Sequence, residues 1–100
     1  MPELNEVRDP STSPSRLEEL ASSVDVKVRS GVGGNPSTPV EVLKRLADDP
    51  ESWVLSSLAR NPSAPGEVLT RLADAPDPGL RIGVALNPST PADVLIRLAD

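Results

Sequence analysis

The sequence contains no cysteine, histidine, phenylalanine or tyrosine, and it has a single tryptophan among its 100 residues. Without Cys or His, the chain has no thiolate nucleophile, no imidazole base and no ligands for a zinc-thiolate or histidine-bound metal site. Because aromatic side chains are almost absent, the core must consist of Leu, Val, Ile and Ala. These absences argue against an enzyme with the usual nucleophile and base, and we expect no cofactor.

Positive charge is also scarce, since 10 Lys and Arg stand against 15 Asp and Glu and give a net charge of -5. This balance opposes binding to nucleic acid, whose phosphates require cations. No stretch approaches the roughly 18 apolar residues of a membrane span, and the first residues lack the basic and apolar regions of a signal peptide. We therefore expect a cytoplasmic protein with no nucleic-acid partner and no membrane insertion within this segment.

Proline, in contrast, is abundant and marks an internal repeat. An Asn-Pro-Ser motif begins at Asn35, returns at Asn61 and again at Asn87, always 26 residues further along, and Asp9 begins a degenerate first copy. A fixed period without insertions predicts one structural unit that is repeated in one geometry.

The first half of each unit predicts a helix with one apolar face. Its start resembles a capping box, in which Thr38 caps, Pro39 occupies the first turn and Glu41 completes the box. Apolar residues then follow at spacings that place them on one helical face. These residues are Leu17, Leu20 and Ala21; Val42, Leu43, Leu46 and Ala47; Val68, Leu69, Leu72 and Ala73; and Val94, Leu95, Leu98 and Ala99.

The second half has a shorter apolar pattern, and its helices should start near Asp25, Pro50 and Pro78. Small residues recur at one position, where they would let neighbouring backbones approach closely: Gly31, Ser57 and Gly83. Because glycine lowers helix propensity by up to about 1 kcal/mol, a short α-helix or a 3-10 helix is expected.

One helical pair is too small to bury its own apolar face, so the units should stack. We predict an all-α helical solenoid of about four repeats, with a closed helical bundle as the alternative. Residues 1–8 would form an extension or cap. The solenoid would occupy residues 9–100, divided into 9–34, 35–60, 61–86 and a half repeat at 87–100.

This pattern resembles the leucine-rich repeat variant proteins of bacteria. Their units combine Asn-Pro, Val-Leu-x-x-Leu-Ala, an Asp-Pro turn and a second segment ending in Val-Ala. Residues 35–60 and 61–86 match almost throughout, 9–34 match loosely, and 87–100 match as a half unit. The resemblance implies a right-handed superhelix of alternating α and 3-10 helices without catalytic activity. Some relatives carry a cysteine-rich iron-sulfur segment, which a chain without cysteine cannot form.

Two further rows of repeated residues have structural interpretations. The asparagines of the Asn-Pro motifs should close turns onto the following Ser or Thr backbone. Each arginine of a second row lies four residues after one acid and three before another, so ion pairs along the helix surface are expected. The second row is Arg45, Arg71 and Arg97, and its expected partners are Glu41, Glu67 and Asp93 or Asp48, Asp74 and Asp100.

Residues that the repeat does not require are the candidates for function. The repeat position of Trp53 holds Lys27 and Gly79 in other units. An exposed Trp is a favoured interface anchor, although it could also extend the core over small neighbours. Other apolar residues at variable positions are Leu55, Ile82, Leu86 and Ile96.

We therefore expect a protein-interaction module or scaffold domain that binds a protein through Trp53, Leu55, Ile82 and Leu86. A weaker alternative is a carboxylate-based or metal-assisted enzyme that uses Asp48, Asp49 and Glu51, although these acids also suit a turn and a helix start. Nucleic-acid binding is a third and poorer alternative.

Overall fold

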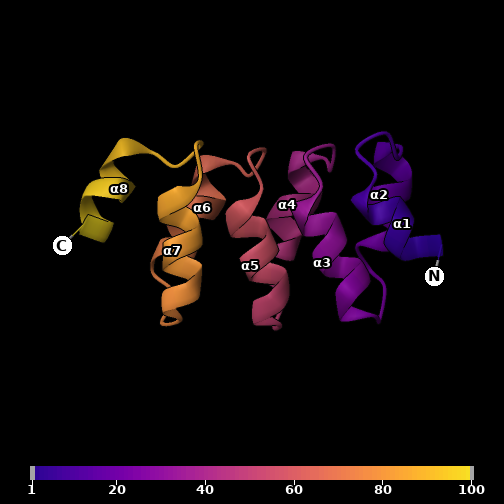
Figure 1. Cartoon of the computed structure of the whole chain (residues 1–100), viewed down its shortest axis with the longest axis horizontal. Helices are drawn as coiled ribbons and strands as arrows, with labels where there is room; N and C mark the ends of the chain where they lie inside the picture. Colours follow the sequence, from indigo (N-terminus) through magenta and orange to yellow (C-terminus); the bar gives the residue numbers. More distant parts are fainter. Residues whose placement is uncertain (1, 100) are drawn as a thin grey trace.

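A computed structural model describes residues 2–99, which form eight α-helices joined by short turns (Figure 1). No strand occurs among these residues. The helices are α1 (Pro2–Arg8), α2 (Pro14–Leu20), α3 (Val26–Gly34), α4 (Val40–Leu46), α5 (Ser52–Arg60), α6 (Gly66–Ala73), α7 (Pro78–Leu86) and α8 (Ala92–Ala99).

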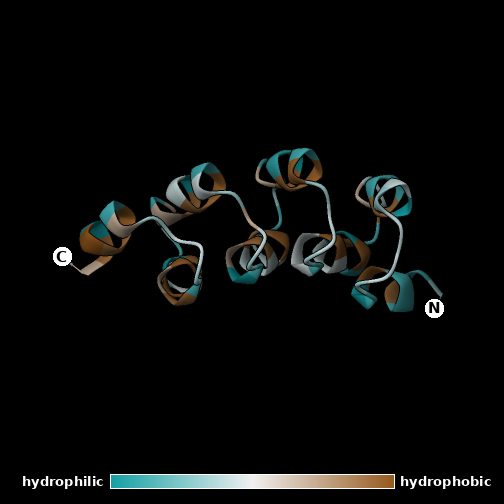
Figure 2. Cartoon of the chain, turned by 90° about the horizontal axis from the view of Figure 1, so that it is seen from above, coloured by the Kyte–Doolittle hydropathy of each residue, from teal (hydrophilic) through white to brown (hydrophobic). Residues whose placement is uncertain are grey.

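The helices stand in two rows along an elongated molecule of 42 × 21 × 18 Å (Figure 2). Helices α1, α3, α5 and α7 form the inner row, on the concave side of a shallow arc, and α2, α4, α6 and α8 form the outer row. Neighbours within the inner row contact one another most extensively. Because helices contact their neighbours along the array and the two ends lie far apart, the fold is the expected helical solenoid and not a closed bundle.

One apolar core runs between the two rows for the length of the array. The expected apolar face of the outer-row helices is buried in the first three units, as in α4, where Val42, Leu43 and Leu46 are all enclosed. The inner row contributes Val28, Val32, Val54, Leu58, Ala59, Leu80 and Val84. Stacking of the units therefore buries apolar side chains that a single helical pair would leave exposed to water.

The second helix of each unit is a short α-helix, the first of the two expected forms, and not a 3-10 helix. Helices α3, α5 and α7 are α-helices of nine residues each, longer than their outer-row partners. The small residues do allow the close approach that was expected. A Cβ atom on Gly31 would overlap the side chain of Val7, and one on Gly83 would lie 3.0 Å from Ala59 Cβ. Close packing against the preceding inner-row helix offsets the low helix propensity of glycine.

The expected capping box at Thr38 is also not formed. Helix α4 begins after Pro39 without a side-chain cap, and the Thr38 hydroxyl instead donates a hydrogen bond of 2.6 Å to the carbonyl of Val32. Thr90 makes the same bond to Val84 at 2.6 Å. The threonine therefore ties the turn to the end of the inner-row helix that precedes it.

Residues 2–8, which were expected to form an extension or cap, fold as the first helix of the inner row. Val7 is fully buried, and its carbonyl accepts a hydrogen bond from Asn35 just as the carbonyl of Gly33 accepts one from Asn61. Helix α1 thus occupies the position that α3 and α5 occupy further along the array.

Candidate functional site

Three buried asparagines form a ladder that holds the units together. Asn61 donates hydrogen bonds of 2.8 and 3.0 Å to the carbonyls of Gly33 and Asn35, one unit earlier, and its Oδ1 accepts a bond of 2.8 Å from the Ser63 amide. Asn35 and Asn87 repeat the arrangement. The expected turn closure is confirmed. The bonds between units were not expected, although an asparagine that recurs every 26 residues is a sequence signal for them.

The arginine row pairs between units and not along one helix. Arg71 forms an ion pair with Asp48 of the preceding unit, and Arg97 lies 3.3 Å from Asp74 in the same way. Arg45 has no such acidic partner in the preceding unit, because Ser22 stands at the repeat position that Asp48 and Asp74 hold in the later units. The expected partner Asp100 lies outside the described residues. These side chains are exposed and the pairs contribute little, so the arginine row is a solvated face.

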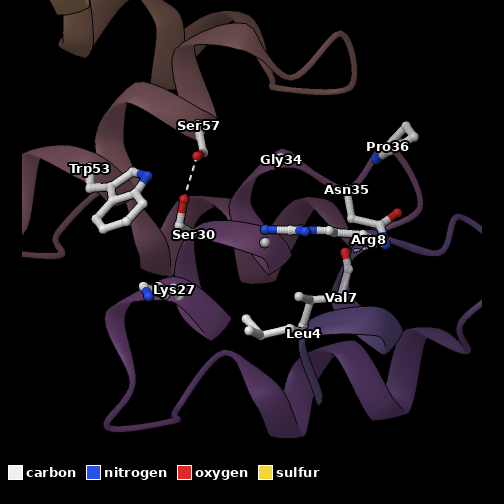
Figure 3. Close-up of a pocket in the computed structure, with 11 residues that line it drawn as sticks. Leu4, Val7, Arg8, Lys27, Ser30, Gly34, Asn35, Pro36, Trp53 and Ser57 are labelled. Atoms are coloured by element: carbon white, nitrogen blue, oxygen red, sulfur yellow. Dashed lines mark hydrogen bonds between the residues drawn. The ribbon is translucent and has the colours of Figure 1, made fainter. Parts of the chain in front are cut away.

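A groove of about 600 Å³ opens between α1, α3 and α5 on the inner row (Figure 3). Trp53 forms one wall, and Leu4 of α1 lies across from it. The lining also includes Val7, Arg8, Lys27, Ser30, Gly31, Gly34, Asn35, Pro36 and Ser57.

The groove exists because the units place small residues where helices meet. Gly31 and Gly34 carry no side chain, and Ser30 and Ser57 direct their hydroxyls at one another at 2.6 Å. Trp53 lies beside these small residues, and 54% of its surface is exposed. The residue therefore stands at the edge of a hollow and is not enclosed in the core.

The charged groups at the groove are cations. Arg8 and Lys27 line it, and no carboxylate from residues 2–99 does. Among residues 2–99, five of the ten Lys and Arg side chains lie within 4.0 Å of a carboxylate, and Arg8, Lys27 and Arg60 are among the five that do not. These three are exposed and belong to the inner row. This face therefore carries positive charge that the chain does not neutralise.

The structure does not bring the other candidate residues into the groove. Leu55 is partly buried and packs against the core, which differs from the exposed position expected for it. Ile82 and Leu86 are exposed on α7, and Ile82 lines a shallow hollow beside Leu98 at the far end of the array. Leu55 lacks exposure because its repeat position, held by Arg29 and Arg81 elsewhere, lies against the turn that precedes the helix.

The carboxylates of the catalytic alternative are held in structural interactions. Asp49 binds Arg29 at 2.7 Å, and Asp48 pairs with Arg71. Burial would raise the pKa of Asp49, but hydrogen bonds from Arg29 and the Glu51 amide overcome that effect and lower it. No three His, Cys, Asp or Glu side chains within residues 2–99 are grouped to hold a metal ion. None of the helices α1–α8 has the length and apolar character that crossing a membrane requires.

Comparison with known proteins identifies the repeat. The family model described as leucine rich repeat variant matches residues 26–51 and 53–77, which together make up half of the chain. Searches of curated proteins and of solved structures gave no match. Each matched segment starts at an inner-row helix, so in this phase the eight helices form four pairs from α1–α2 to α7–α8. The period, the stacked helical pairs and this match together place the chain in the leucine-rich repeat variant family.

Proposed function

We propose that this chain is a protein-interaction module, and that its binding surface is the inner row centred on the groove beside Trp53. The observation that carries the proposal is the exposure of Trp53, 54%, on the wall of a groove of about 600 Å³. Trp residues at the centre of an interface frequently supply a large share of the binding energy. A half-exposed Trp next to a hollow matches that role.

The repeat itself supports this choice of residue. Positions that recur in every unit are explained by turns, packing and hydrogen bonds between units, whereas the position of Trp53 holds Lys27 and Gly79 elsewhere. Stacking therefore does not require an aromatic residue there. Leu86, 79% exposed on α7, would extend the same surface along the inner row. Leu55 drops out of the proposed surface because it packs against the core. A cytoplasmic location remains part of the proposal.

The test is a pull-down from the native cell with the wild-type chain, Trp53→Ala and a matched control, Ile96→Ala. Ile96 is also an exposed apolar residue, at 68%, but lies on α8 of the outer row. We expect Trp53→Ala to weaken capture by a factor that corresponds to about 2 kcal/mol, while Ile96→Ala retains it. Circular dichroism should show the same helical content in all three proteins. Equal capture by Trp53→Ala and the wild type would contradict the proposal.

A further inference from the structure

The distribution of carboxylates along this acidic chain is uneven. Helices α3, α5 and α7 contain no Asp or Glu, although the whole chain has 15. The same three helices carry four cations: Lys27, Arg29, Arg60 and Arg81. The outer-row helices, in contrast, each carry at least one acid. Helices α3, α5 and α7 are thus positive on a molecule whose net charge is -5, whereas α1 of the same row carries Glu3 and Glu6 beside Arg8.

Two of the four cations on α3, α5 and α7 already interact with other groups of the chain. Arg29 binds Asp49 at 2.7 Å, and Arg81 donates to the carbonyl of Ala75 at 2.8 Å. Arg8 and Lys27 at the groove have no such partner among the described residues, and Arg60 lies free on the same face. Their charge is therefore available to a ligand in the groove.

We infer that the groove binds an acidic peptide segment, with one or more carboxylates at Arg8 and Lys27 and an apolar side chain between Trp53 and Leu4. This inference rests on the proposed function and specifies the chemistry of the partner. Charge complementarity selects the carboxylates, since no acid lines the groove. The exposed Trp53 ring and the Leu4 side chain provide the apolar contact.

The size of the groove agrees with a short segment of chain. Its volume, about 600 Å³, lies within the range of about 300–1,000 Å³ typical of sites for small ligands. A nucleic acid is a poorer fit, because its many phosphates would meet a few cations on a molecule that is negative overall. A peptide with local acidic charge requires only those cations.

The experiment is selection of a displayed library of random short peptides on the full-length chain. We expect the selected peptides to be enriched in Asp and Glu next to a bulky apolar residue. Their affinity should fall at least about tenfold in the double variant Arg8→Glu/Lys27→Glu, because both contacts become repulsive. Raising the salt concentration should also weaken binding, since these cations are exposed.

Arg45→Glu is the matched control, because Arg45 is also an exposed cation without a carboxylate partner among residues 2–99 but lies on α4 of the outer row. It should leave the affinity unchanged. Selected peptides that are neutral or basic would overturn the inference, as would acidic peptides whose binding depends on Arg45 and not on Arg8 and Lys27. A chain that selects no peptide, or that prefers single-stranded DNA or RNA to the acidic peptides, would also overturn it.

Failure of this inference can be separated from failure of the proposed function. If the selected peptides are uncharged but bind Trp53→Ala more weakly than the wild type, the inference of an acidic partner is wrong and the groove is still the binding site. If Ile96→Ala loses capture in the pull-down while Trp53→Ala retains it, the proposal that the groove is the binding site is wrong.

Discussion

The two ends of the array complete the hydrophobic core differently. At the first unit, Glu6 and Arg16 form an ion pair of 2.8 Å. The equivalent positions in the later units hold the buried apolar pairs Val32 and Val42, Leu58 and Val68, and Val84 and Val94. A partly exposed polar pair therefore replaces a buried apolar one at the first unit of the described residues.

At α8 the same repeat sequence is left partly uncovered. Leu95 is 39% exposed, whereas the equivalent Leu17, Leu43 and Leu69 are fully buried, each beneath the inner-row helix that follows. No helix follows α8 among the described residues. The repeat motif thus fixes the direction of a side chain, and the neighbouring unit decides whether that side chain is buried.

The largest effect should come from truncating that leucine at two equivalent positions. Leu69→Ala should lower the free energy of unfolding by about 2 to 5 kcal/mol, because it opens a cavity in the enclosed core. Leu95→Ala should cost less than about 1 kcal/mol, because it is already partly solvated. Chemical denaturation of both variants measures the difference. Similar losses would show that α8 is covered in solution.

The next effect concerns the asparagine ladder. Asn61→Ala removes two hydrogen bonds to the preceding unit and one within its own turn, and leaves buried carbonyls with fewer donors. We expect a loss of about 1 to 3 kcal/mol in the free energy of unfolding. The control is Ser63→Ala, whose hydroxyl makes a single exposed bond of 2.8 Å to the Pro36 carbonyl. If the two variants unfold alike, the ladder does not hold the units together.

A smaller effect, of the opposite sign, is expected at Ala64. Thr38 and Thr90 each donate a hydroxyl to the end of the inner-row helix, but the central unit has Ala64 at that position. Ala64→Thr should therefore add the missing bond to the carbonyl of Leu58 and raise stability by about 0.5 to 1.5 kcal/mol. Ala64→Val, of similar shape without the hydroxyl, is the control. A threonine variant no more stable than the valine variant would refute the prediction.

The smallest effect concerns the ion pair at the first unit. The hydrogen bond from Arg16 lowers the pKa of Glu6, so the pair contributes stability above the ordinary Glu pKa near 4.5 and loses it as the pH falls through the lowered value. The melting temperature of the wild type should therefore fall more than that of Glu6→Gln during acidification from neutral pH. Parallel melting curves at each pH would show that the pair does not stabilise this end.

The period made much of the fold predictable from the sequence. Spacing of the Asn-Pro motifs gave the units, and the Leu and Val positions gave the outer-row face, because both are local patterns that recur without insertion. The turn closed by Asn35 was also predictable, since an Asn before Pro acts within its own segment. Contacts between units were not predictable from the sequence. Examples are the hydrogen bond from Asn61 to Gly33 and the ion pair between Arg71 and Asp48.

The candidate site was predictable only in its central residue. Trp53 was identified because the repeat does not require it, whereas Arg8 belongs to a segment with no recognisable motif and joins the groove only through stacking of α1 on α3. Leu55 was misleading because a variable position is not always an exposed one. Burial at such positions depends on the preceding turn, which the repeat pattern does not describe.

The asparagine ladder also has a mechanical consequence. Its bonds link each unit to the one before it along a single edge, at the carboxyl ends of the inner-row helices, and the distances from amide to carbonyl vary only between 2.7 and 3.0 Å. The opposite edge is linked by ion pairs, one between Arg29 and Asp49 and the exposed pairs of Arg71 with Asp48 and Arg97 with Asp74. Because buried hydrogen bonds join the units at one edge and mainly exposed ion pairs join them at the other, we expect the array to bend more easily in one plane than in others. The asparagine edge should therefore keep the spacing and register of the units at the end of the groove that Gly34, Asn35 and Pro36 line.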